Sequence, residues 1–145
     1  MSVEKGFEFL EHTADAYVAA YGRDFSEALE NAAVATFEVM TDVKKVSPSV
    51  EDVVEVLASD EGALLYSWLE ALLVKSEVLG LLYSKFKVVS LENVSEGFRL
   101  RAKIWGEKFD SKKHLQKVGV KAVTYHRMEV IKKPNLVTLR FILDI

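Results

Sequence analysis

Carboxylates near the two ends of the chain are the first residues whose types could do chemistry. Asp15 closes the segment 11–15 (EHTAD), which we place at a connection between strands, and Asp144 interrupts an otherwise apolar C-terminal end followed only by Ile145. A carboxylate on so apolar a strand is costly to bury unless it is paired or binds a metal. With the α-carboxylate of Ile145, the two aspartates would form an all-oxygen site that selects Ca²⁺, Mg²⁺ or Mn²⁺ over Zn²⁺. The alternative is that Asp15 caps a turn and Asp144 is a solvated end residue.

Two histidines and a lysine lie in the same short segments. His12 precedes Asp15, and residues 121–126 (KAVTYH) form part of a late strand. Alternation along that strand places Lys121, Val123 and Tyr125 on one face and Ala122, Thr124 and His126 on the other. His12 and His126 are either metal ligands or pH-sensitive contacts, or they hydrogen-bond a neighbouring backbone group.

Several classes of chemistry find no support in the residue types. The 145 residues include no Cys, which excludes disulfides and thiolate metal sites and fits an intracellular setting. The zinc-protease, serine-elbow, P-loop and dinucleotide-binding motifs are all missing. No signal peptide is visible, and the most apolar stretch, residues 63–74, is too short to span a bilayer. We therefore expect a cytoplasmic protein with no membrane contact.

Charge is divided unevenly along the chain. Residues 1–98 carry 7 Lys and Arg against 18 Asp and Glu, whereas residues 99–145 carry 12 against 4, which sums to the net charge of -3. The whole chain is not basic enough to indicate a free-standing nucleic-acid-binding protein. The two halves either neutralise each other within one fold or mark a surface for a charged partner. A basic loop could grip phosphate or an acidic protein, or be merely solvated; its basic residues are Lys108, Lys112, Lys113, His114 and Lys117.

The elements that must position these residues follow from periodicity. Asp24 is a good N-cap, and Glu27 completes a capping-box-like pair for a helix that ends near Thr41. Residues 59–61 offer a start for a second helix. The stretch 63–79 that follows is apolar nearly all round, which indicates a buried central helix. Strands are predicted at residues 7–11, 15–23, 50–58, 83–90, 98–105, 120–132 and 136–145, the last two joined by the Lys-Pro-Asn turn at 133–135. Runs of consecutive strands favour antiparallel pairing, so we predict a single α+β domain over residues 1–145, with a mostly antiparallel sheet packed against two helices.

Taken together, three segments resemble the archease family. Residues 12–15 resemble its N-terminal H-T-A-D signature, residues 121–126 resemble its K-A-V-T-Y-H strand, and Asp144 matches its aspartate beside the C-terminal end. The likeness runs from about Phe7 to Ile145. One departure is the pair Lys113–His114, where the family often has Arg-His; lysine lacks the fork that binds phosphate or carboxylate through two bonds.

The resemblance implies a non-catalytic accessory protein. Archeases assist the GTP-dependent, RtcB-type tRNA-splicing ligase, promoting its guanylylation and its multiple turnover. Carried over residue by residue, Asp15 and Asp144 would bind a divalent cation, with the Ile145 carboxylate as a further ligand and His12, Lys121 and His126 nearby. We expect Ca²⁺ before Mg²⁺ or Mn²⁺, the ligase as the partner, and only an indirect association with tRNA.

Two other functions compete with this one. A small metal-dependent phosphate-ester hydrolase or transferase would use Asp15 and Asp144, with His126 close enough to act as base on a metal-bound water. A general chaperone-like protein would instead expose a large apolar patch.

Overall fold

A computed structural model describes residues 6–12 and 15–145 of the chain. The β1 and β2 strands, Phe7–His12 and Asp15–Gly22, precede the α2 helix, Phe25–Met40, and a short 3₁₀ helix η1, Val43–Lys45. The β3 strand, Val50–Ala58, leads into the α3 helix, Glu61–Leu79. Four strands complete the chain: β4 (Leu81–Val94), β5 (Gly97–Lys108), β6 (Ala122–Lys133) and β7 (Leu136–Asp144). The predicted order of elements is confirmed.

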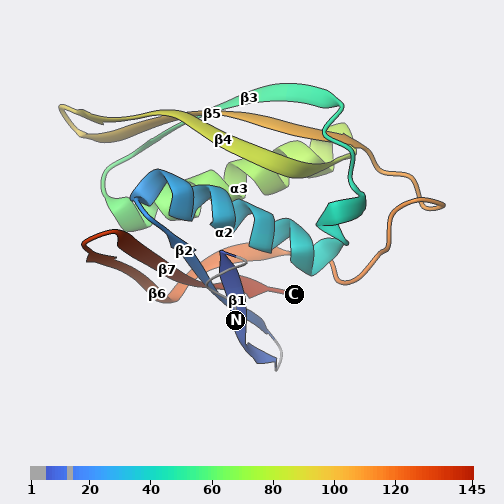
Figure 1. The fold of residues 1–145 in the computed structure, drawn as a ribbon, viewed down its shortest axis with the longest axis horizontal. Helices are drawn as coiled ribbons and strands as arrows, with labels where there is room; N and C mark the ends of the chain where they lie inside the picture. Colours follow the sequence, from blue (N-terminus) through green and yellow to red (C-terminus); the bar gives the residue numbers. More distant parts are fainter. Residues whose placement is uncertain (1–5, 13–14) are drawn as a thin grey trace.

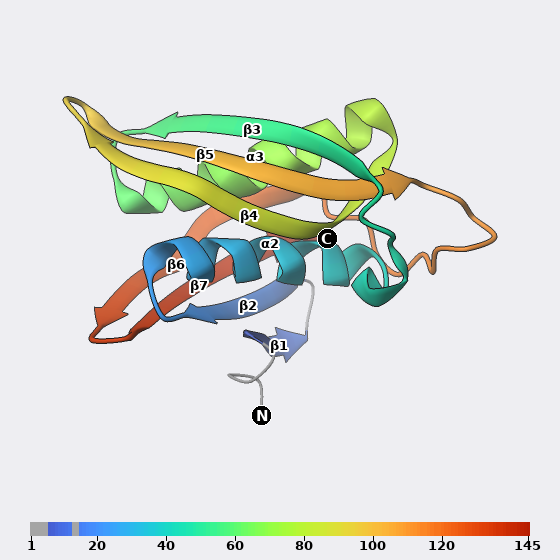
Figure 2. The ribbon, with the colours of Figure 1, turned by 45° about the horizontal axis from the view of Figure 1, so that its top comes forward.

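The strands form two antiparallel sheets with the helices between them. Sheet A has the order β1-β2-β7-β6, and sheet B has the order β3-β5-β4. Figures 1 and 2 show α2 and α3 as a middle layer, covered by sheet B on one side and sheet A on the other. The α+β class is confirmed, but the division of the strands between two sheets was not visible in their order along the chain.

The α2 helix begins as its sequence indicates. The Asp24 side chain accepts a hydrogen bond from the Glu27 amide at 2.8 Å, as an N-cap should. Glu27 completes the exchange one residue further out than expected, accepting from the Arg23 amide at 2.8 Å. The helix is held to its neighbour α3 by the indole N–H of Trp68, which donates to the Leu29 carbonyl at 2.8 Å in the core.

The buried residues of α3 end at Leu72, so the prediction of a buried central helix was wrong for its C-terminal turns. The Asp60 side chain caps its first turn, and Gly80 ends it in the left-handed conformation. Leu64, Leu65, Trp68, Leu69 and Leu72 are buried, whereas Val74 and Val78 are 53% and 76% exposed. The helix contacts both sheets, and Lys75 pairs with Asp52 of β3 at 3.1 Å, but Val74 and Val78 on its C-terminal turns remain exposed.

The β4–β5 hairpin is longer than its sequence suggests. The segment 91–97, which separates the strands predicted at residues 83–90 and 98–105, is mostly strand, and the chain reverses at residues 95–96 with Gly97 at φ 136°. The free edge of β4 is irregular near Val88, whose amide donates to the Glu30 carboxylate on α2 at 2.8 Å. This contact occupies an edge amide that could otherwise pair with a foreign strand.

The inward faces of both sheets and the helices share one continuous core. Ala16, Val18 and Ala20 of β2 contribute from sheet A, and Val54 and Val56 of β3 contribute from sheet B. In the part of the chain that the structure describes, neither helix is long and apolar enough to cross a membrane.

Candidate metal centre at the end of the four-stranded sheet

The structure brings Asp15 and Asp144 together. They are direct cross-strand partners on β2 and β7, the two central strands of sheet A, and Ala122 of β6 lies on the other side of Asp144. Their neighbours Ala16 and Leu143 point into the core, so alternation places both aspartates on the outer face of the sheet. Cross-strand partners have Cβ atoms about 5 Å apart. Two residues separated by 129 positions in sequence are thus adjacent; we call this pair the carboxylate rung.

The carboxylate rung has the chemistry of an incomplete cation site. Like charges directly opposite each other on paired strands are destabilising, and a cation bound between them would offset the repulsion. Carboxylate oxygens suit Ca²⁺, Mg²⁺ or Mn²⁺. Among the side chains that the structure describes, which do not include those of Glu11 and His12, no three His, Cys, Asp or Glu gather in one place. The described side chains therefore offer two carboxylates, whereas Ca²⁺ takes six to eight oxygen ligands.

The C-terminal residue and Lys121 lie beside the rung. The Lys121 amide donates to the Asp144 carbonyl at 2.7 Å, which ties the start of β6 to the end of β7. Lys121 and Ile145 both line a groove of about 760 Å³ between the second half of α3 and residues 118–123. Glu70 and Glu77 line the same groove from α3. Sequence reasoning missed these two glutamates, although their seven-residue spacing places them on one side of the helix.

His126 lies apart from the carboxylate rung. Pairing of β6 with β7 is regular from Ala122 to Thr124 and resumes only at Glu129, so residues 125–128 form a bulge that contains Arg127 at φ 58°. The predicted strict alternation therefore fails after Thr124, and His126 is exposed. The bulge is held by ring contacts: Tyr125 stacks on Tyr66 of α3 at 4.4 Å between centroids.

His12 is described only through its backbone. It is the last residue of β1 and pairs with Ala16 of β2, next to the position of Asp15. The prediction for its side chain, like that for Thr13 and Ala14, lies outside the described residues.

The basic loop between β5 and β6 uses most of its charged side chains internally. Lys113 Nζ lies 2.7 Å from the Glu107 carboxylate and 2.9 Å from the Ser47 hydroxyl. Lys117 Nζ lies 2.6 Å from the Glu38 carboxylate, and Lys108 Nζ donates to the Leu79 carbonyl at 3.1 Å. These contacts favour a structural role for the loop over the grip on phosphate that its composition suggested.

His114 is the buried anchor of this loop. Its Nδ1 accepts from the Asp110 amide at 2.9 Å, so its Nε2 carries the proton and donates to Glu107 at 2.9 Å. Hydrogen bonds to Glu107 from Lys113, from the Ser47 amide and from His114 lower the pKa of this carboxyl group to about 2. The pair Lys113–His114 therefore holds the loop against β5.

Comparison of the chain with known proteins shows its family. The sequence profile of the Archease protein family (MTH1598/TM1083) matches residues 7–145, and the chain belongs to this family. An archease from Sulfurisphaera tokodaii is 49% identical over 140 residues, covering 96% of this chain and 98% of that protein. An archease from Sulfolobus acidocaldarius is 46% identical with the same coverage.

Solved structures carry the same fold. The solution structure of Methanobacterium thermoautotrophicum protein 1598 is 43% identical and superposes with a TM-score of 0.85, covering 97% of this chain and 99% of that one. The crystal structure of a Thermotoga maritima protein, described as an archease and possible chaperone, has a TM-score of 0.62 at 14% identity, covering 95% of this chain and 96% of that one. The second likeness concerns the fold alone.

Proposed function

We propose that this archease is an accessory protein that activates a GTP-dependent, RtcB-type tRNA-splicing ligase. In this role it promotes guanylylation and multiple turnover of the ligase and catalyses no reaction itself. Asp15, Asp144 and the Ile145 carboxylate would hold a divalent cation, Ca²⁺ before Mg²⁺ or Mn²⁺, and the protein would act in the cytoplasm. Bound cations neutralise phosphate charge in nucleotidyl transfer, which is the chemistry such a site would supply.

The carboxylate rung is the observation that carries this proposal. Asp15 and Asp144 face outward from sheet A, where a large partner can reach them, and no described His, Cys, Asp or Glu side chain joins them as a third ligand. A cation held by the two aspartates and the Ile145 carboxylate would keep coordination positions free for water, substrate or partner groups. An open site of this kind suits an accessory protein that shares or exchanges a metal with another active site.

Multiple-turnover RNA ligation tests the proposal directly. An RtcB-type ligase is assayed with this chain at sub-stoichiometric amounts, next to the Asp144→Asn variant, which removes one charge from the rung and keeps the side-chain size. We expect stimulation by the parent and none by the variant. Glu96→Gln is the matched control, because Glu96 is an exposed carboxylate in the β4–β5 turn of the other sheet. It should stimulate as the parent does.

Two outcomes count against the proposal. Stimulation by Asp144→Asn equal to that of the parent would mean that the rung has no part in activation. Failure of the parent to stimulate a ligase that is competent by itself, and that responds to its own archease, would refute the activator role.

The hydrolase alternative finds less support in the geometry. Its base, His126, would have to reach a water on the cation, yet His126 lies in the β6 bulge and joins no group of ligating side chains within the described residues. Release of phosphate from nucleotides by the purified chain alone would revive this alternative.

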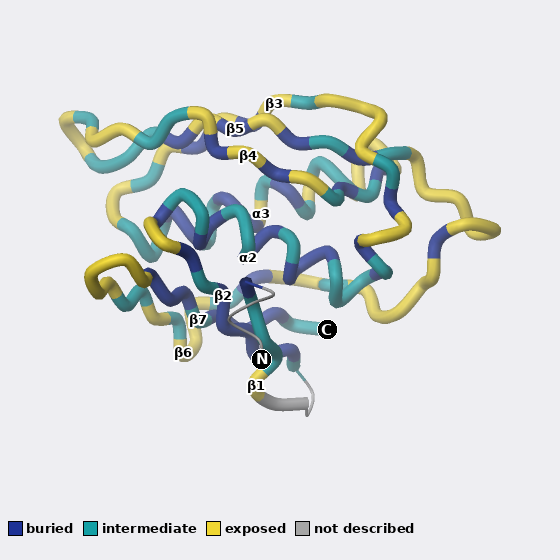
Figure 3. The backbone as a smooth tube through the Cα atoms, viewed as in Figure 1, coloured by how far each residue is buried: buried dark blue, intermediate teal, exposed yellow. Residues whose placement is uncertain are grey.

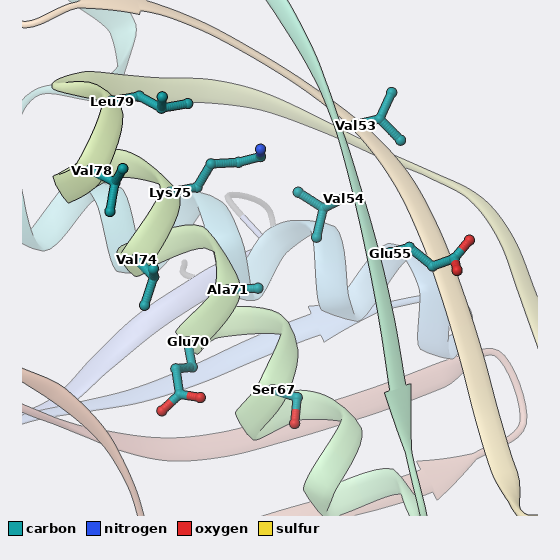
Figure 4. A pocket seen from close by; sticks show the side chains of 10 residues that line it. All are labelled: Val53, Val54, Glu55, Ser67, Glu70, Ala71, Val74, Lys75, Val78 and Leu79. Atoms are coloured by element: carbon teal, nitrogen blue, oxygen red, sulfur yellow. The ribbon is translucent and has the colours of Figure 1, made fainter.

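One observation favours a chaperone-like role as the second candidate. An open groove of about 520 Å³ runs between β3 and α3, with Val53, Val74, Val78 and Leu79 among its lining residues (Figure 4). Exposed apolar surface of this kind is what a chaperone-like contact needs. The fluorescence of a dye that binds apolar surface should increase when the parent protein is added, and the increase should be smaller with Val78→Ser. The control Val89→Ser removes an exposed valine from β4 instead.

A further inference from the structure

The outer face of sheet B is open at its centre. The helices pack against the opposite face (Figure 2), and Figure 3 shows exposed and buried positions alternating along these strands. On β5, the central strand, the buried residues are Leu100, Ala102 and Ile104. The residues that alternate with them, and therefore point outward, are Arg99, Arg101, Lys103 and Trp105. From Arg99 to Trp105, every outward position of β5 is thus cationic or aromatic, and the next outward position is Glu107.

Two lysines stand directly opposite each other at the centre of this face. Lys87 of β4 is the cross-strand partner of Lys103 of β5, and the partner of Lys103 on the other side is Val53. No carboxylate shares their rung, and neither lysine has an ion-pair partner at 4.0 Å or less in the described part of the chain. The charge of Lys87 contributes to lowering the pKa of Glu27 on α2, but Glu27 is already paired with Arg23, whose hydrogen bonds are the main cause.

Opposed like charges weaken a sheet unless something binds them. A pair of cations on facing positions costs stability, just as the pair of carboxylates on sheet A does. An anion placed between the two ammonium groups would remove this cost. The two lysines therefore place positive charge without an ion-pair partner on a surface that no part of the described protein covers.

The rungs on either side of the lysine pair add further cations and the Trp105 ring. Lys85 Nζ lies 4.6 Å above the centre of the Trp105 ring, whose N–H donates to Glu51 at 3.1 Å. On the opposite side of the lysine pair, Arg101 Nε lies 3.2 Å from the Glu55 carboxylate. Both glutamates belong to β3, and a third carboxylate, Glu92 of β4, is the cross-strand partner of Arg99, so the cations between Lys85 and Arg101 have carboxylates along the β3 border and at the Arg99 end. The Arg101–Glu55 pair is about half exposed and holds Arg101 weakly.

We propose that this strip, Lys85, Lys87, Arg101, Lys103 and Trp105, binds the phosphate backbone of single-stranded RNA. We call it the basic face. Its cations follow one strand at intervals of about 7 Å and lie about 5 Å apart across strands, so they meet a linear polyanion at successive points. Contacts of this kind go to phosphates and therefore carry little sequence preference.

The composition of the basic face favours nucleic acid over an acidic protein. Lysine is depleted in protein–protein interfaces, whose centres are apolar, whereas nucleic-acid interfaces are strongly positive. The outward side chains here are mainly charged. Trp105 adds a ring of the type on which unpaired bases stack. The net charge of -3 for the whole chain conceals this local concentration of cations.

This inference goes beyond the proposed function, which assigns the chain only an indirect association with tRNA. It also does not depend on that function, because its test contains no ligase. The basic face lies on sheet B, and the carboxylate rung lies on the far side of the helical layer (Figure 1). The two surfaces can therefore be tested separately.

Fluorescence anisotropy with a labelled oligouridylate of about 12 nucleotides measures the predicted binding. The full chain is titrated at salt concentrations from about 50 mM to about 200 mM, where electrostatic binding changes most. Four phosphate contacts predict a slope of log affinity against log salt of about -2.8, from about -0.7 per contact on single strands. The Lys87→Gln/Lys103→Gln variant should reduce this slope by about 1.4 and weaken binding at 50 mM salt on the order of 60-fold.

A charge-matched variant separates the basic face from general attraction. Lys44→Gln/Lys45→Gln removes the same charge from two exposed lysines of η1, outside sheet B. It should bind as the parent does, apart from a small change in long-range attraction. Thermal unfolding confirms that the test variant is folded; relief of the lysine repulsion predicts that its Tm does not fall.

Three results would overturn the proposal. The first is no binding by the parent at millimolar protein in 50 mM salt. The second is an equal loss of affinity in both double variants, which would indicate attraction to net charge alone. The third is displacement of the RNA by a decaglutamate peptide at an equal concentration of negative charge, which would assign the basic face to an acidic protein.

Discussion

Neutralising one carboxylate of the rung should have opposite effects with and without metal. In chelator, Asp144→Asn removes a cross-strand repulsion worth about 0.2 to 1 kcal/mol. For a chain of this length, 1 kcal/mol corresponds to about 3 to 4 °C in Tm. We therefore expect the Tm of the variant to rise by about 1 to 4 °C above that of the parent when no cation is present.

Saturation with a cation should reverse this order. A ligand at about 100 times its Kd stabilises the folded state by about 2.7 kcal/mol, or about 9 °C in Tm at the same conversion. The parent should gain this stability with Ca²⁺, and Asp144→Asn should gain little or none. Differential scanning fluorimetry of both proteins, in chelator and then in increasing Ca²⁺, Mg²⁺ or Mn²⁺, measures all four values.

Glu96→Gln serves as the control for this experiment. Glu96 lies in the β4–β5 turn and is exposed, so its loss should leave both the metal-free Tm and the response to cations unchanged. A lower Tm for Asp144→Asn in chelator would show that the two aspartates stabilise each other and would refute the repulsion argument. A parent that responds to none of the three cations would refute the metal centre itself.

Three further predictions concern the scaffold. Glu107→Gln should lower the unfolding free energy at neutral pH by about 2 kcal/mol through its lost charge-assisted contact with Lys113. Because folding lowers the pKa of Glu107 from 4.5 to about 2, the stabilisation from its charge is present above pH 4.5 and disappears toward pH 2. Denaturant titrations between these pH values should show that the unfolding free energy of the variant depends less on pH than that of the parent. Trp68→Phe should cost about 2 to 4 kcal/mol in the same assay, from a cavity and a lost buried hydrogen bond, and an unchanged midpoint would contradict the packing described. Gly106→Ala should prevent stable folding, because the added Cβ would lie 1.9 Å from the Leu82 carbonyl oxygen. If circular dichroism gave this variant the Tm of the parent, β4 and β5 would have to be able to separate at this point, which would contradict the prediction.

The elements were predictable because their signals are local. The Asp24 cap and the apolar spacing of α2 depend on residues within a few positions of each other, and the structure confirms both. The pairing of strands depends on contacts across the whole chain. Nothing in the alternation of β3 or β5 indicates that they belong to a separate sheet from β2 and β7.

The candidate site shows the same division between local and distant information. Residue types identified Asp15 and Asp144 as unusual carboxylates, but only the register of β2 with β7 makes them direct partners. The position of His126 was out of reach because a bulge with a positive φ at Arg127 interrupts the alternation on which the prediction rested. Arg127 lies over the Tyr17 ring at 4.5 Å, a contact between strands that no local pattern encodes.

Both outer faces of the molecule contain a rung of like charges, and the fold explains how both are tolerated. The carboxylate rung of Asp15 and Asp144 lies on sheet A, and the rung of Lys87 and Lys103 lies on sheet B. The two lysines are exposed and the two aspartates are half-buried, so water reaches both rungs, and the repulsion in each costs at most about 1 kcal/mol. The buried middle layer of helices stabilises the fold and keeps the two rungs on opposite sides. A cation-dependent contact with a ligase and a phosphate contact with RNA would therefore not compete for surface, so one molecule could make both at once.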